Sequence, residues 1–301
     1  MIWITCPAFE PNGGQRKGST GVGRVTSRYR VVRMADGVAT ARPDSLAAEE
    51  PLEIRVAGRA LTVTMRTPGN DFDLARGFLV SEGVVAADSD IAAIRYCAGA
   101  TADGANSYNV LDVVLADGVP LPDVSVERNF YTTSSCGLCG KASLEAVRTI
   151  SRWRVDRDPL RLNAATISSL PEKLRAAQRV FDRTGGLHAA ALFDANGDLW
   201  CVREDVGRHN AVDKVVGWAL DQRRLPLSGT TLMVSGRASF ELVQKAVMAG
   251  IPALAAVSAP SSLAVDLARE MGLTLIGFVR GSSMNVYSAV ERIPSGEPLP
   301  C

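Results

Sequence analysis

The part of the chain that follows residue 186 alternates short apolar strands with helical stripes, and this pattern constrains the fold most strongly. Residues 187–193 and 199–202 are strand-like and flank turn residues at 194–198, which predicts a β-hairpin. Continuous apolar runs predict three further strands, at residues 231–234, 253–257 and 273–279. Because fully apolar strands that alternate with helices are typical of a parallel sheet covered on both faces, we predict a three-layer α/β/α domain.

Helices are predicted between these strands. The first carries its apolar side chains on one face, at Val212, Val215, Val216 and Ala219. Two further stripes end at Gly250 and Gly272, and glycine commonly follows the last turn of a helix.

The earlier part of the chain predicts a smaller α+β segment. Alternating strands are expected at residues 52–56 and 61–65, a helix over 72–79 and another strand over 108–115. The first 24 residues are rich in Gly, Pro and Ser, which favours a disordered tail over a mitochondrial-type presequence. The chain is therefore divided into a tail (1–24), an N-terminal α+β subdomain (25–150), an α/β domain (151–293) and a second tail (294–301).

Composition narrows the class of protein. A chain of 301 residues with 47% hydrophobic and 22% charged residues suits a soluble globular protein. Its net charge of +1 gives no long-range attraction to nucleic acid or to an anionic membrane. No apolar run approaches the roughly 20 residues that span a bilayer. The six cysteines are too sparse for a secreted disulfide framework, so we expect the protein in the reducing cytoplasm.

The predicted strands end in loops that suit an anion. In open α/β sheets, ligands bind beyond the carboxyl ends of the strands. The loops there offer serine hydroxyls, arginine side chains and backbone N–H groups. The first loop contains Ser235, Gly236 and Arg237, the second contains Ser258, and the third contains Arg280, Gly281, Ser282 and Ser283. Since helix N-termini and guanidinium groups both attract anions, we expect a phosphate-bearing ligand, although any one such loop is also an ordinary helix cap.

The two histidines of the chain lie at the boundaries of predicted elements. His209 belongs to a charged run at residues 203–210, at a junction between a strand and a helix. There it could exchange a proton, or the run could be a polar helix cap with surface ion pairs. His188 follows two glycines at the start of a strand.

Cys136 and Cys139 form a C-x-x-C pair flanked by glycines, just before a predicted helix at residues 141–147. A structural zinc site would need two more ligands, and the chain has no second C-x-x-C pair. A redox dithiol usually lies inside a βαβ unit, whereas this pair precedes the α/β half. The third interpretation is a nucleophilic thiolate that carries sulfur as a persulfide, favoured by a position near a helix start.

Taken together, these motifs resemble the FdhD family of sulfurtransferase accessory proteins of formate dehydrogenase. The resemblance covers residues 25–293, and its motifs are residues 78–83, SSCGLCG at 134–140, RTGGLHAAA at 183–191, EDVGRHNAVDK at 204–214, SGRASFELVQKA at 235–246, SAPSSLAV at 258–265 and GFVRGSSMNVYS at 277–288.

The resemblance implies a cytidine-deaminase-like fold, typically dimeric, and a role as a sulfur carrier. Sulfur would come from a cysteine desulfurase as a persulfide on Cys136, with Cys139 assisting. It would pass to the molybdenum or tungsten bis-molybdopterin guanine dinucleotide cofactor of formate dehydrogenase. The family's cofactor-binding stretch falls on Phe278, Val279, Arg280, Gly281, Ser282 and Ser283. We add Ser235, Gly236, Arg237, Ser258 and His209 to the candidate binding residues.

A rival hypothesis is a non-catalytic chaperone that holds the cofactor and passes no sulfur. We also expect no catalytic zinc, because the deaminase signature is missing: residues 207–209 do not form H-x-E and no P-C-x-x-C follows.

Overall fold

A computed structural model describes residues 25–97, 108–122 and 147–294 of the protein. Its smaller sheet has the strand order β4-β3-β6-β5 and is formed by β3 (Glu50–Val56), β4 (Arg59–Arg66), β5 (Ile91–Tyr96) and β6 (Val110–Leu115). Helix α2 (Asp71–Ser81) follows β4. These elements confirm the strands and the helix predicted before residue 116.

The larger sheet has six strands in the order β12-β11-β10-β9-β7-β8. Its strands are β7 (His188–Asp194), β8 (Leu199–Asp205), β9 (Thr230–Val234), β10 (Ala253–Ala256), β11 (Thr274–Arg280) and β12 (Ser283–Val286). In this sheet β9, β10 and β11 are parallel, whereas β7 runs antiparallel to both β8 and β9, and β12 runs antiparallel to β11. The sheet is thus mixed rather than parallel, because a tight hairpin necessarily reverses the chain between β7 and β8.

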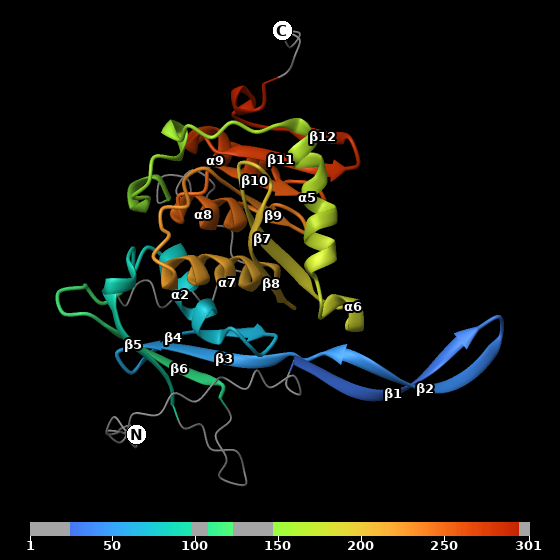
Figure 1. Ribbon diagram of the computed structural model, residues 1–301. Coiled ribbons are helices and arrows are strands. Elements are labelled where there is room, and N and C mark those ends of the chain that lie inside the picture. The colour runs from blue at the N-terminus through green and yellow to red at the C-terminus, as the bar shows by residue number, and fades with distance from the viewer. Residues whose placement is uncertain (1–24, 98–107, 123–146, 295–301) are drawn as a thin grey trace.

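Helices cover both faces of the larger sheet, as predicted (Figure 1). Helices α7 (Arg208–Asp221), α8 (Phe240–Met248) and α9 (Ser262–Met271) lie on one face and α5 (Ala164–Ala177) lies on the other. Two consecutive residues of β9 show the two layers: Leu232 joins the core under α7 and α8, whereas Met233 joins the core under α5. The structure is therefore an α/β protein whose larger sheet is sandwiched between helices.

Helices α2 and α7 join the two parts of the molecule at a very close crossing. A Cβ atom built on Gly77 would lie 1.8 Å from the carbonyl oxygen of Asp213, and one built on Gly217 would lie 1.8 Å from that of Asp73. Only glycine permits this approach of one helix backbone to the other.

A long hairpin of β1 (Thr26–Ala35) and β2 (Val38–Ala47) extends away from both sheets (Figure 1). The sequence analysis missed it, because most of its side chains are exposed and no apolar alternation marks it. The turn residues Asp36 and Gly37, both with positive φ, were the available signal, since Asp-Gly is a common hairpin turn.

The remaining elements are α6 (Phe181–Thr184) and the short 3-10 helices η1 (Asp88–Asp90), η2 (Val155–Arg157) and η3 (Val290–Arg292). Within the described ranges, no helix is long and apolar enough to cross a membrane. Residues 1–24, most of the second tail and most of the helix predicted at 141–147 lie outside the described residues. The domain boundary near residue 150 stays a prediction.

Candidate functional site

Three loops meet at the carboxyl edge of the parallel strands. We call them the edge loops; they comprise residues 235–239, 258–262 and 278–283. The Ala238 N–H donates to the Ala259 carbonyl at 3.2 Å, and the Ser261 N–H donates to the Ala238 carbonyl at 3.0 Å. The Phe278 N–H donates to the Ser258 carbonyl at 3.2 Å. These bonds bring residues predicted from separate motifs to one edge of the sheet.

The edge loops present cations to solvent. Arg237 and Arg280 are exposed, and neither guanidinium group forms an ion pair or hydrogen bond with another residue that the structure describes. Ser282 and Ser283 are also exposed. Unpaired guanidinium forks beside free hydroxyl groups suit a phosphate.

Phe278 and Val279 differ in how accessible their side chains are to a ligand. Phe278 is 41% exposed and has a φ of 54°, an uncommon backbone conformation for a bulky residue. The register between β11 and β12 shifts at this point, which turns the ring outward. Val279 is buried in the core under α5, so its contact with any ligand at this edge is limited to its backbone.

His209 is the second residue of α7 and faces the first edge loop. Its Nε2 lies 3.2 Å from Ser239 Oγ and 3.7 Å from Glu241 Oε2. The neighbouring His209 is the largest cause that lowers the pKa of Glu241 to about 2. His209 therefore lies beside the first edge loop, with an anionic partner that the sequence did not reveal, and its role in binding stays a prediction.

His188 stands at the other side of the same loop. A Cβ atom on Gly236 would lie 3.3 Å from His188 Nδ1, so the loop passes close to the imidazole. Burial, and then the nearby charges of Arg208 and His209, lower the pKa of His188. At neutral pH this ring is neutral and can both donate and accept a hydrogen bond.

The two acids of the 203–210 run have structural roles. Asp205 is fully buried, pairs with Lys214 at 2.6 Å and accepts a hydrogen bond from the Thr67 N–H at 3.1 Å. Glu204 accepts hydrogen bonds from the N–H groups of Val180 and Phe181. The interpretation of this run as a polar helix cap with surface ion pairs is not found: α7 has no side-chain cap, and the Asp205–Lys214 pair is buried. His209, in contrast, faces the edge loops.

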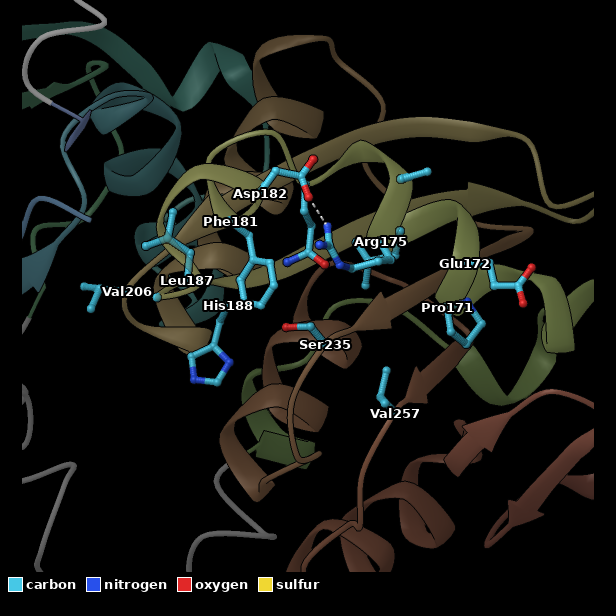
Figure 2. Close-up of a pocket in the computed structure, with 15 residues that line it drawn as sticks. Pro171, Glu172, Arg175, Phe181, Asp182, Leu187, His188, Val206, Ser235 and Val257 are labelled. Carbon is cyan, nitrogen blue, oxygen red and sulfur yellow. Dashed lines mark hydrogen bonds and ion pairs between the residues drawn. The ribbon is translucent and has the colours of Figure 1, made fainter. Parts of the chain in front are cut away.

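A cavity of about 980 Å³ lies beside the edge loops, between α5, α6 and the larger sheet (Figure 2). Phe181, His188 and Ser235 lie toward one end of it, and Pro171 and Glu172 lie toward the other. Sequence reasoning missed this cavity because α5 was not predicted. The signal was present: Asn163 caps the helix, its side chain accepting a hydrogen bond from the Ala165 N–H, and the buried residues Ile167, Leu170 and Leu174 share one face.

Cys136 and Cys139, the predicted thiols of the site, lie outside the described residues. The described cysteines, Cys97 and Cys201, are buried and form no disulfide. Burial raises the pKa of Cys201 to about 12, so this thiol is not a nucleophile at neutral pH. Within the described ranges, no three His, Cys, Asp or Glu side chains are grouped as metal ligands. The expected lack of catalytic zinc stays a prediction.

These features define an α/β protein in which loops that can bind an anion lie beside a cavity large enough for a small-molecule ligand. A family model described as "FdhD/NarQ family" matches residues 47–294. The chain is 68% identical over 273 residues to the sulfur carrier protein FdhD of Streptomyces avermitilis, covering 90% of this chain and 97% of the relative. It is 59% identical over 275 residues to the protein of the same name from Mycobacterium tuberculosis, covering 90% and 100%.

A solved structure has a similar fold. It is a candidate formate dehydrogenase accessory protein from Desulfotalea psychrophila, with a TM-score of 0.68 and 27% identity. The match covers 90% of this chain and 100% of that chain. The chain belongs to the FdhD/NarQ family, as its sequence motifs indicated.

Proposed function

We propose that this protein is a cytoplasmic sulfur carrier that takes sulfur from a cysteine desulfurase and delivers it to the molybdenum bis-molybdopterin guanine dinucleotide cofactor of formate dehydrogenase. The observation that carries the proposal is the close similarity to relatives named as sulfur carrier proteins, at 68% identity over 273 residues. Cys136 is the proposed carrier, and a homodimer is the proposed assembly.

The transfer can be written with balanced atoms. The Cys136 thiolate attacks the terminal sulfur of the desulfurase persulfide, forms an S–S bond and releases the desulfurase thiolate. The terminal sulfur then replaces an oxygen ligand of the molybdenum in the substrate cofactor. Cys139 forms a disulfide with Cys136 in that step, which supplies the two electrons that reduce the sulfur to sulfide. The proton of the Cys136 persulfide and the proton of the Cys139 thiol leave with the oxygen as water.

The edge loops are the proposed binding site for the cofactor's diphosphate groups. Arg237 and Arg280 have no ion-pair partner among the residues that the structure describes, and Ser235, Ser258 and Ser283 are potential hydrogen-bond donors. His209, held by Ser239 and Glu241, would stand beside the bound phosphates. Gly236 lets the first loop pass close to His188 without a side chain in the way.

Activation of formate dehydrogenase in cells that lack their own copy of this protein tests the proposal. We expect Cys136→Ala to abolish activation and Arg280→Ala to weaken it, while both variants still fold. If Cys136→Ala supports full activation, the carrier role is wrong. If that result accompanies loss of activity in Arg280→Ala, the protein is instead a cofactor-binding chaperone.

A further inference from the structure

The hairpin of β1 and β2 stands apart from the rest of the protein (Figure 1). Ten residues of each strand are paired, so the arm is roughly 33 Å long at the usual rise of a strand. Within the described ranges it forms a two-stranded sheet of its own and pairs with neither larger sheet. Because a lone two-stranded hairpin is only marginally stable in water, a partner that pairs with it would stabilise it.

The outer edge of β1 presents backbone groups that β2 does not use. The Ala48 N–H donates to the Val25 carbonyl at 2.9 Å, just before the first pair of the hairpin. Hydrogen-bonded and non-hydrogen-bonded pairs alternate in an antiparallel ladder, so the even-numbered residues of β1 form the non-hydrogen-bonded pairs. Their N–H and carbonyl groups therefore point away from β2. The exposed residues of this kind are Arg28, Arg30, Val32 and Met34.

The two edges of the hairpin differ. On β2 the outward-facing backbone groups belong to the odd-numbered residues, and Pro43 is one of them. Proline has no N–H, so it interrupts the row of donors and protects that edge from pairing. The β1 edge contains no proline or glycine between residues 26 and 35. A strand from another molecule can therefore pair along the whole of β1 but not along the whole of β2.

The hairpin is basic in a chain that is close to neutral. Residues 26–47 contain four arginines and two aspartates, whereas the net charge of the chain is +1. None of the four guanidinium groups forms an ion pair or a hydrogen bond with a residue that the structure describes. Three of the arginines lie on β1, where a second copy of the same strand would bring like charges together. The charge therefore disfavours pairing of β1 with itself and favours an acidic partner.

The exposed side chains of the hairpin indicate a protein as the partner rather than a nucleic acid or a membrane. Tyr29 is 57% exposed, and Val32 and Met34 are 65% and 66% exposed. Tyrosine, methionine and arginine are enriched at the centre of protein interfaces, where lysine is depleted. The hairpin contains all three of the enriched residue types and no lysine.

We propose that the outer edge of β1 docks an extended acidic segment of a partner protein, which adds to the hairpin as a third strand. The outward-facing N–H and carbonyl groups hold the segment in register. Arg28 and Arg30 lie on one face of the three-stranded sheet and Arg33 lies on the other, so the carboxylates of the segment find a cation on either face. The proposal involves no sulfur and does not rest on the proposed function.

Fluorescence anisotropy of a labelled peptide tests this docking edge in the full-length protein. The probe is a peptide of alternating glutamate and valine, matched in length to β1, and its control is a peptide of alternating lysine and valine. We expect saturable binding of the acidic peptide and none of the basic peptide. Binding should weaken severalfold between about 50 mM and about 500 mM salt, because salt screens exposed charges.

Val32→Pro and Ala41→Pro are a matched pair of variants, because the two residues lie directly opposite each other. Both N–H groups point away from the partner strand, so the hairpin keeps its own hydrogen bonds in either variant. Val32→Pro removes a donor from the middle of the β1 edge and should weaken binding about tenfold or more. Ala41→Pro alters only the β2 edge and should bind like the wild type.

Arg30→Glu leaves the backbone unchanged, so it remains informative if Val32→Pro disturbs the hairpin. We expect it to weaken binding of the acidic peptide about tenfold. Equal binding of the two peptides, or no saturable binding of the acidic peptide at about 1 mM, would overturn the proposal. Equal weakening by Val32→Pro and Ala41→Pro would also overturn it. A change from dimer to monomer in Val32→Pro, measured by sedimentation velocity, would assign the edge to a second copy of the chain instead.

Discussion

The crossing of α2 and α7 makes a quantitative prediction for Gly77→Ala. In an ordinary helix this change stabilises the protein by about 0.5–1 kcal/mol, because alanine is the better helix former. Here the new Cβ would lie 1.8 Å from the Asp213 carbonyl oxygen, whereas real Cβ atoms stay at least 3.0 Å from such atoms. The two backbones would have to separate by more than an ångström, in a core that is otherwise closely packed.

Overpacking of this kind costs about 1–3 kcal/mol and exceeds the gain in helix propensity. We therefore expect Gly77→Ala to lower the free energy of unfolding by about 2 kcal/mol, measured by urea denaturation with an unchanged m-value. Gly186→Ala is the control, because the nearest atom to its Cβ would lie at an ordinary 3.7 Å. A Gly77→Ala protein more stable than the wild type would refute the close crossing.

Three further predictions concern buried or paired groups. Lys214→Ala should destabilise the protein by about 3–5 kcal/mol in urea denaturation, because it leaves the Asp205 carboxylate buried without its cation; a loss below 1 kcal/mol would contradict the pairing. The lowered pKa of Glu241 stabilises the fold above the unfolded value near 4.5, and this contribution disappears as pH falls toward 2. The stability difference between wild type and Glu241→Gln should therefore shrink between pH 6 and pH 2.5, and a constant difference would show that the carboxylate is not held by His209. Cys201 should resist iodoacetamide in the native protein at pH 8 and react after unfolding, as mass mapping would show, because burial raises its pKa to about 12.

The sequence predicted the strands and loops that form the site better than it predicted how the other elements pair and pack around them. The short apolar runs of β9, β10 and β11 are typical of strands in a buried parallel sheet. The residues that follow these strands consequently lie together at the carboxyl edge of that sheet. The pairing of β7 with β9 was not predictable, because a hairpin signal fixes the pairing within the hairpin but not its place in a larger sheet.

Other features depend on contacts between distant segments. Lys214 and Asp205 are charged residues that local patterns place at the surface, but each is buried by its partner and by α2 packing on α7. The cavity joins Gln178 on one segment to Ser235 on another, and neither residue belongs to a motif with the other. Such sites become visible only when the chain is folded.

Intact-mass spectrometry after incubation with a cysteine desulfurase and cysteine tests the central claim most directly. The account predicts an added mass of about 32 Da, one sulfur atom, on the wild type and on Cys139→Ala, and none on Cys136→Ala. An adduct that persists in Cys136→Ala, or its absence from the wild type, would contradict the assignment of Cys136 as the sulfur carrier.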